Sequence, residues 1–506
     1  MVDTTNLFSF FSLLSCILFT IFLIKWVFNN VTGNHKNLPP SPPKLPVLGN
    51  LLQLGLYPHR SLQTLAQRHG SLMLLHLGSA PTLVVSSADA AREIMTTHDL
   101  IFSNRPDSEN ARKLLYNYRD LSLSPYGEYW RKMRSICVLQ LLSAKRVQSF
   151  RFIREEETFS LVKKVEEGCA GSSPIDLGQL FASLTTDIIC RAAFGRKYSE
   201  GGSGKKFKEL LEEFGALLGV FNIADFVPWL AWINNFNNLN ARVEKVFKEF
   251  DKFLEEILDD HMKRGGKDKK EAEKDFVNVL LENSKNGSED VSIGRDSIKA
   301  LILDMFAAGS DTTYTALEWT MTELLGHQEV MKTAQEEIRS ICGNRPTVRE
   351  EDLEKILYLK AIIKESMRLH PPVPLLLPRE SREDVRVQGY DILAGTRVII
   401  NAWTIGRDPT TREDAEQFRP DRFLESSVDL KGNDFQLIPF GAGRRGCPGI
   451  TFATAAMEIA LANLLHKFDW ALPGGLKPER LDVTEAPGLA VHRKIPLTAV
   501  ATLHSF

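Results

Sequence analysis

The chain has 506 residues, of which 43% are hydrophobic and 25% are charged, and its formal net charge is −2. This balance is typical of a large globular protein and excludes a disordered chain. The near-zero net charge also excludes the strongly basic surface on which nucleic-acid-binding proteins rely. The six cysteines are scattered along the sequence, without the density of a disulfide scaffold or the close pairing of a zinc site.

The N-terminus contains an apolar stretch from Leu7 to Phe28 in which Lys25 is the only charged residue. As a helix this stretch would be about 33 Å long, enough to cross a hydrocarbon core of about 30 Å. We therefore predict a membrane anchor over residues 1–30. Lys36 and Lys44 follow it while Asp3 precedes it, and this bias places the body of the protein in the cytosol. A cleaved signal peptide is the alternative, but a basic n-region and a small-residue cleavage site are both lacking.

Prolines follow the anchor in the run LPPSPPKLPVLGN, residues 38–50, so we expect residues 31–50 to form a stiff tether and residues 51–506 to form a single large domain. The polar stretch 263–292 is interpreted as a surface loop around a short helix. Helical periodicity covers residues 91–97, 207–218, 241–261, 298–325 and 353–369, whereas strand patterns such as 82–86 and 397–401 are fewer. The expected fold class is mainly α with small β-sheets.

A glycine-rich loop, FGAGRRGCPG, occupies residues 440–449. Cys447 lies just before a predicted helix over residues 449–465, where free amide groups and the helix dipole stabilise a thiolate. The glycines at 441, 443 and 446 also match a dinucleotide-binding fingerprint, with the strand-like residues 435–440 before it. That alternative predicts a nicotinamide-dependent dehydrogenase, but too little chain follows the motif for a doubly wound sheet.

Other motifs lie upstream of this loop. Glu365 and Arg368 are three apart on one predicted helical face, and the sequence FRPDRF at residues 418–423 adds Arg422. The predicted helix 298–325 contains AAGSDTT at residues 307–313, where a threonine hydroxyl can bond back to the preceding turn and distort the helix. Trp130 and Arg134 are four apart, so they lie side by side on another helix.

Together these motifs resemble the cytochrome P450 family from the tether to the C-terminus, and the likeness is greatest to plant microsomal A-type, family-71-like members. The loop matches the family pattern F-x-x-G-x-R-x-C-x-G through Phe440, Gly443, Arg445, Cys447 and Gly449. The resemblance implies a P450 fold with one catalytic domain. It also implies a haem b whose iron takes Cys447 as its axial ligand.

The resemblance further assigns roles to individual residues. Cofactor-binding residues would be Trp130, Arg134, Arg379 and Arg445 at the haem propionates, Phe440 and Gly449 in the cysteine loop, and Ala308 and Gly309, which would leave room for oxygen over the iron. Asp311 and Thr312 would be the catalytic residues that relay protons to oxygen, and Glu365, Arg368 and Arg422 would form a structural network that braces the haem loop. The substrate pocket would be formed by Val373, Leu375, Leu376, Leu377 and Leu489, completed by residues 104–123. The proline-rich run 371–378 is stiff, and a buried core strand is its alternative reading.

The resemblance implies an NADPH-dependent monooxygenase that inserts one oxygen atom from O₂ into a small apolar substrate. The substrate would belong to plant specialised metabolism, as a terpenoid, phenylpropanoid, coumarin or amino-acid-derived compound. Electrons would come from NADPH-cytochrome P450 reductase at the endoplasmic reticulum membrane, with Arg131, Lys132, Lys145, Arg146 and Arg444 as candidates for its docking surface. Two alternatives remain open: a haem-thiolate isomerase or dehydratase, and a haem-based sensor or carrier.

Overall fold

The structure is a computed structural model. It describes residues 37–169, 174–198, 202–264, 274–285 and 293–505, together with residues 12, 13, 15–17, 19 and 20. Most of the predicted anchor and the first part of the predicted tether lie outside these residues. Within the described ranges no single helix is long and apolar enough to cross a membrane, although one pair bent by 107°, Phe207–Asp225 with Pro228–Phe236, meets the requirement together.

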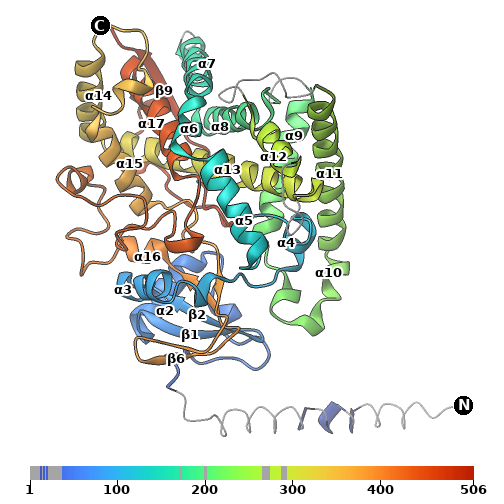
Figure 1. The fold of residues 1–506 in the computed structure, drawn as a ribbon. Helices are drawn as coiled ribbons and strands as arrows, with labels where there is room; N and C mark the ends of the chain where they lie inside the picture. Colours follow the sequence, from blue (N-terminus) through green and yellow to red (C-terminus); the bar gives the residue numbers. More distant parts are fainter. Residues whose placement is uncertain are drawn as a thin grey trace, which may run out of the picture.

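Helices make up most of the molecule and surround one long central helix. Helix α13 (Arg295–Gly326) runs through the middle and contacts α8 (Leu177–Phe194), α15 (Leu357–Leu369) and α17 (Ile450–Lys467) (Figure 1). A helix covered on several sides must be apolar on several faces, and α13 accordingly buries Leu301, Phe306, Leu317 and Trp319. The remaining helices are α2 (Pro58–His69), α3 (Ala88–Arg92), α4 (Glu109–Leu114), α5 (Glu128–Ile136), α6 (Ala144–Ser149), α7 (Arg151–Cys169), α9 (Gly202–Gly219), α10 (Ile233–Phe236), α11 (Leu239–Arg264), α12 (Phe276–Lys285), α14 (Gln328–Cys342) and α16 (Ala402–Gly406).

The strands form small sheets. The largest has the order β1-β2-β7-β4 and is made of β1 (Leu72–Leu77), β2 (Ala80–Val85), β7 (Arg397–Ile400) and β4 (Arg379–Glu380). It lies at the lower end of the molecule in Figure 1, where the blue N-terminal strands meet orange C-terminal segments. The other sheets are β3 (Ile175–Asp176) with β9 (Thr498–Leu503) and β8 (Phe468–Ala471), and the hairpin β5 (Val385–Val387) with β6 (Tyr390–Ile392). The mainly helical fold class is thus confirmed.

The predicted elements match the structure except at particular ends. Helix α15 begins at Leu357 rather than at residue 353, because the amide groups of Leu357 and Tyr358 donate at 3.0 Å to Glu337 of α14. The predicted helix 91–97 is divided between α3 and a π-helical turn, Glu93–Thr97.

The strand-like reading of residues 435–440 is wrong. Turns close this segment on both sides, since Leu437 donates its amide to Asp434 and Gly441 donates to Ile438. Pro439 has no amide hydrogen to offer a neighbouring strand. In the described part of the chain the named strands form one parallel pair, β2 with β7, so the doubly wound sheet that a dinucleotide-binding fold needs is not found there.

The second half of the predicted tether lies against the body. The amide of Asn37 donates to the carboxylate of Asp391 in β6 at 2.9 Å, and the amide of Leu74 in β1 donates to the carbonyl of Pro40 at 2.9 Å. The main hydrophobic core fills the space around α13, and smaller cores lie against the four-stranded sheet.

Candidate functional site

The cysteine loop ends directly at the start of α17. The Cys447 amide donates to the carbonyl of Phe440 at 2.9 Å, and the Gly449 amide donates to the Cys447 sulfur at 3.3 Å. Burial raises the pKa of the Cys447 thiol, whereas the Gly449 amide and the Arg134 guanidinium lower it. A partly buried sulfur with an amide donor and a cation nearby is suited to bind a metal ion as a thiolate, because the positive charge of the metal offsets the cost of burying the thiolate.

Glycine allows this loop to approach the turn after α3. Gly443 has a φ of +68°, and a Cβ atom there would lie 2.2 Å from the carbonyl oxygen of Met95. Only a residue without a side chain fits this position. The next residue, Arg444, donates its amide to Asp99 at 2.9 Å, so the loop is fixed to that turn.

Three buried arginines meet beside the cysteine loop. Arg445 donates to backbone carbonyls of Ser103, Leu121 and Ser124; Arg379 donates to Asp99 and to the carbonyl of Ala442; Arg105 donates to the carbonyls of Ser122, Leu377 and Pro378. Burial lowers the pKa of all three guanidinium groups, and proximity to one another lowers those of Arg105 and Arg445 further. For Arg445 the pKa falls to about 9.

This cluster carries an excess of positive charge. Carbonyl groups satisfy most of its hydrogen bonds but not its charge. Asp99, paired with Arg379 at 3.2 Å, and the nearby Asp120 are fewer than the three guanidinium groups that they face. An anionic group with two carboxylates, such as haem with its propionates, fits such a cluster. Trp130 packs its ring 4.2 Å from the Arg445 guanidinium and donates its indole N–H to the carbonyl of Leu121.

No motif in the sequence indicated Arg105, although it lies within the stretch 104–123 expected to border the pocket. Its role becomes visible only through its neighbours in space, because it stands far from Arg379 and Arg445 in the chain.

One face of α13 is open. Ala308 is exposed although Phe306 and Ser310 next to it are buried, so an open space borders the helix at this point. The hydroxyl of Thr312 donates back to the carbonyl of Ala308 at 2.6 Å, as the sequence predicted. The helix nevertheless continues without a break from Arg295 to Gly326, so the expected distortion does not interrupt it.

Gly309 faces a different way from Ala308. A Cβ atom at this position would lie 2.7 Å from Cδ1 of Ile189, so the glycine allows α13 and α8 to pack closely. Ala308 and Gly309, which were predicted to share one role, therefore lie on different surfaces of α13.

Asp304 of α13 is hydrogen-bonded to the loop of Leu121 and Ser122, which lies next to the arginine cluster. Its carboxyl accepts the amides of Leu121 at 2.5 Å and of Ser122 at 3.3 Å. Burial and the nearby Asp120 raise the pKa of Asp304 to about 8. Because Leu121 in turn accepts from Trp130 and Arg445, this carboxyl helps to place the residues of the arginine cluster. No motif in the sequence indicated this carboxyl.

The predicted charge network does assemble. Arg368 donates to both oxygens of Glu365, at 2.7 and 2.8 Å, and Arg422 donates to Oε1 of Glu365 at 3.0 Å. The side chains of Glu365 and Arg368 are 0% exposed. The guanidinium of Arg368 also donates to carbonyls of Gly406, Ala415 and Gln417. The network therefore ties α15 to the segment that leads into the cysteine loop.

The predicted pocket residues have different neighbours. The segment 371–378 makes a turn, in which Leu376 has a φ of +53° and donates its amide to the carbonyl of Val373, so it is not a core strand. Leu376 lies beside Gly441 of the cysteine loop, whereas Leu375 packs into the core under β1. Val373 and Leu377 are partly exposed. Leu489 is 37% exposed and lies against Gly219 at the end of α9.

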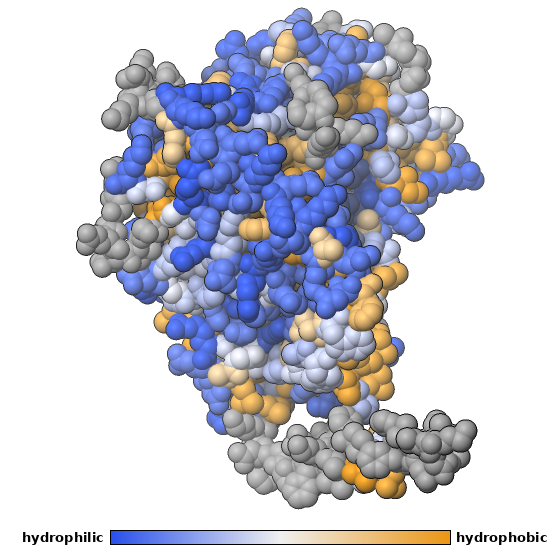
Figure 2. All heavy atoms as spheres, turned by 90° about the vertical axis from the view of Figure 1, so that its right-hand side faces the viewer, coloured by the Kyte–Doolittle hydropathy of each residue, from blue (hydrophilic) through white to orange (hydrophobic). Residues whose placement is uncertain are grey.

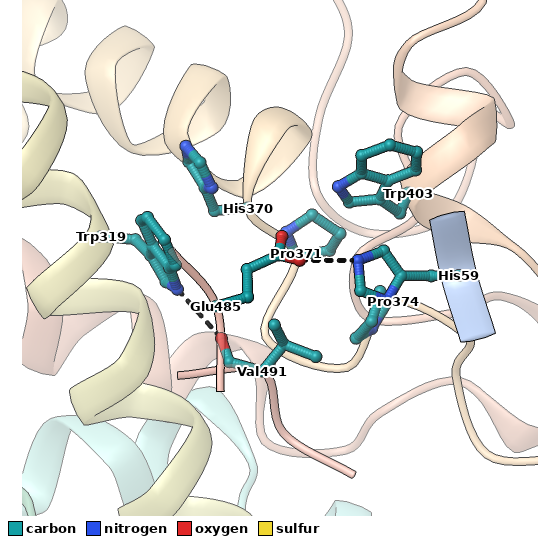
Figure 3. A pocket seen from close by; sticks show the side chains of 8 residues that line it. All are labelled: His59, Trp319, His370, Pro371, Pro374, Trp403, Glu485 and Val491. Atoms are coloured by element: carbon teal, nitrogen blue, oxygen red, sulfur yellow. Dashed lines mark hydrogen bonds and ion pairs between the residues drawn. The ribbon is translucent and has the colours of Figure 1, made fainter. Parts of the chain in front are cut away.

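A small pocket lies on the other side of segment 371–378. It is lined by His59, Trp319, His370, Pro371, Pro374, Trp403, Glu485 and Val491 (Figure 3). Its free volume of about 10 Å³ is far below the range of roughly 300–1,000 Å³ that small-molecule pockets occupy. Figure 3 shows Trp319 of α13 donating to the carbonyl of Val491 and His59 bonded to Glu485. The pocket thus marks where the C-terminal loop is attached to α13.

The basic residues proposed for docking do not all reach the surface. Arg131, Lys145 and Arg444 are exposed and Lys132 is partly exposed. Arg146 is wrong as a docking residue, because it is only 7% exposed and donates to the carbonyl of Gln140.

A thiol at a helix start, a cluster of buried cations and an open face on a central helix fit a haem-thiolate protein. The chain belongs to the cytochrome P450 family, whose profile matches residues 39–497. It is 56% identical to "Cytochrome P450 736A117" of Prunus mume over 96% of this chain and 95% of that one. It is 50% identical to "Norfluorocurarine oxidase" of a Strychnos species over 97% of both chains.

Solved structures show the same fold. A zebra fish cytochrome P450 with progesterone matches with a TM-score of 0.77 and 25% sequence identity, over 88% of this chain and 99% of that one. The protein is therefore a haem-containing monooxygenase of the plant P450 type, which acts on a small substrate with O₂ and a redox partner.

Proposed function

We propose that this protein is an NADPH-dependent monooxygenase in which the Cys447 thiolate would hold the iron of haem b. The observation that carries the proposal is the position of Cys447, with an amide donor at its sulfur, beside a cluster of buried arginines. A thiolate-bound haem supplies the activation of O₂ that such chemistry requires. Electrons reach the site from NADPH through a partner reductase.

Residues of the chain then have separate tasks. Arg105, Arg379 and Arg445 hold the carboxylates of the cofactor, and the Trp130 ring supports the Arg445 guanidinium. The hydroxyl of Thr312 donates to Ala308 beside the open face, where it can turn to donate to a water molecule or to the reacting oxygen. Asp311, one residue earlier, supplies the proton. A positioned proton transfer of this kind contributes roughly 100-fold to 10,000-fold to a rate.

The substrate is a small apolar compound of plant specialised metabolism, such as a terpenoid, phenylpropanoid, coumarin or amino-acid-derived molecule. The apolar side chains of Val373, Leu376 and Leu489 support this class. A plant relative acting as an oxidase supports it as well. The proton relay of Asp311 and Thr312 favours oxygen insertion over isomerisation or dehydration, which need no such relay.

The test uses the purified full-length protein with three variants. We expect Cys447→Ala to abolish the strongly red-shifted carbon monoxide band of the reduced protein and all turnover, because no other soft anionic ligand is at hand. Cys342→Ala, which removes another buried thiol, is the control and keeps both. Thr312→Ala keeps the band but diverts NADPH from product to hydrogen peroxide. A red-shifted band in Cys447→Ala would refute the ligand assignment, and unchanged coupling in Thr312→Ala would refute the relay.

The proposed location is the endoplasmic reticulum membrane, with residues 1–30 as a single-pass anchor and the catalytic domain in the cytosol. A second contact with the membrane, besides the anchor, is supported by the exposed side chains of Phe221, Trp229, Trp232 and Phe236, which lie around α10. Figure 2, in which the right-hand side of Figure 1 faces the viewer, shows hydrophobic patches at the lower end of the molecule. A chain lacking residues 1–36 should keep weak binding to lipid vesicles and lose it when Trp229 and Trp232 are changed to Ser; binding that persists would contradict the second contact.

A further inference from the structure

His492 lies against the side chain assigned to proton supply. Its Nε2 atom is 3.3 Å from Oδ1 of Asp311, and its Nδ1 atom is 2.6 Å from Oγ1 of Thr315. The Thr315 hydroxyl is also 2.7 Å from the carbonyl oxygen of Asp311. Asp311 and Thr315 are one helical turn apart on α13, so the imidazole closes a ring of contacts with the residue that it faces.

The imidazole is fixed in place from several sides. Its ring stacks on Tyr314 at 5.0 Å between centroids and 2° between planes. The carbonyl of His492 accepts the amide of Ala486, and the neighbouring Val491 is bound through its carbonyl to Trp319 of α13 (Figure 3). On the other side, Arg493 donates to the hydroxyl of Thr322, also on α13. Contacts of His492 and of both its neighbours therefore hold the imidazole beside Asp311.

The contacts restrict where the protons are. Thr315 has one hydroxyl proton, and if it donates this proton to the Asp311 carbonyl, Nδ1 of His492 must donate to Thr315. If Thr315 instead donates to Nδ1, then Nε2 carries the ring proton and donates it to the Asp311 carboxylate. When both nitrogens are protonated, every contact is satisfied at once. Among these arrangements only the neutral imidazole protonated at Nδ1 lacks an Nε2–H directed at the carboxylate, and its contact with Oδ1 then requires a protonated Asp311.

Other charges around the pair come from several elements. Glu318 and Tyr314 lie on α13, Arg493 lies next to His492, and Asp176 and Glu212 approach from β3 and α9. The hydroxyl of Tyr314 and the carboxylates around it cannot replace the imidazole, because these groups have no N–H to donate to Oδ1 of Asp311. Asp311 is 42% exposed and His492 is 25% exposed, so water can reach both.

We propose that His492 is a positioning residue for the monooxygenase reaction: through Nε2 it holds the carboxylate of Asp311 and exchanges a proton with it. This inference rests on the proposed role of Asp311 in proton supply. No bond other than the N–H and O–H bonds between these atoms is made or broken. Each proton that Asp311 gives up is replaced from the imidazole, which recovers it from water.

The test compares His492→Phe with His492→Gln in the full-length protein with its reductase. Phe keeps the stacking on Tyr314 but has no donor, whereas Gln keeps a donor toward Asp311 but cannot titrate. We expect His492→Phe to lower the product formed per NADPH by about 10-fold, the lower end of the loss when the orienting partner of a functional side chain is removed. His492→Gln should recover most of the coupling at neutral pH but lose the pH dependence of the wild-type protein. Both should retain the red-shifted carbon monoxide band.

A second measurement does not depend on turnover. Thermal unfolding midpoints are compared among the wild-type protein, His492→Phe, Asp311→Asn and the double variant, and we expect the effects of the single changes to be non-additive because the side chains interact directly. Additive midpoints together with unchanged coupling and pH profile in His492→Phe would overturn the role of His492. Unchanged coupling in Asp311→Asn would instead overturn the proton relay itself. If His492→Phe loses its haem, the pH profile of His492→Gln decides.

Discussion

The charge network around Glu365 permits a prediction whose size can be worked out from its contacts. Oε1 of Glu365 accepts three hydrogen bonds, from Arg368, the Arg419 amide and Arg422, and Oε2 accepts one from Arg368 at 2.7 Å. In Glu365→Gln the amide oxygen can take the place of Oε1. The amide nitrogen must then face the Nε–H of Arg368, so two donors oppose each other.

The same substitution removes the negative charge shared by two guanidinium groups. Arg368 is fully buried and Arg422 is 13% exposed, so one cation is left without compensation in the interior. Breaking a buried ion pair in this way costs about 3–5 kcal/mol. Proteins are stable by only about 5–15 kcal/mol, so the loss is a large part of the total. Arg422→Ala should cost less, because Glu365 keeps both bonds to Arg368.

Urea unfolding of the purified haem protein, followed by tryptophan fluorescence and by the carbon monoxide band, measures these effects. We expect the midpoint to fall strongly for Glu365→Gln and moderately for Arg422→Ala. Glu354→Gln removes an exposed carboxylate just before α15 and should leave the midpoint unchanged. A Glu365→Gln protein as stable as this control would show that the network carries no net stability and would refute the reasoning.

Two further predictions concern α13 and the pocket. The folded protein raises the pKa of Asp304 from 3.8 to about 8, so between these values the folded state keeps a proton that the unfolded state loses, and stability falls as the pH rises toward 8. Asp304→Asn keeps an acceptor for the Leu121 amide but does not titrate. The melting temperature of this variant should therefore rise relative to that of the wild-type protein as the pH increases from 5 to 8. A difference in melting temperature that does not change with pH would contradict the raised pKa. Val373→Phe should change which substrate carbon is oxidised. The Leu375 side chain packs under β1, so Leu375→Ala should cost about 2 kcal/mol of stability and leave the product pattern unchanged. Product analysis and urea unfolding of both variants separate these effects.

The sequence by itself determined several of the elements and the reaction class. Local spacing places Cys447 before a helix, pairs Glu365 with Arg368 and directs the Thr312 hydroxyl to Ala308, because each of these relations spans a few residues along one helix or loop. The family motif then identified the cofactor. Such relations can be recognised in the sequence because the geometry of a helical turn is the same wherever the turn lies in the fold.

Tertiary structure decided which residues from distant parts of the chain complete the site. Arg105 joins Arg379 and Arg445, Asp304 reaches the loop at Leu121, and His492 reaches Asp311 across 181 positions of sequence. No periodicity links these partners, since they meet only when α13 packs against the C-terminal loop and the segment before α5. Burial also decided what the sequence could not, because Arg146 resembles a surface residue until its neighbours cover it, and Leu375 is partly buried against the core under β1.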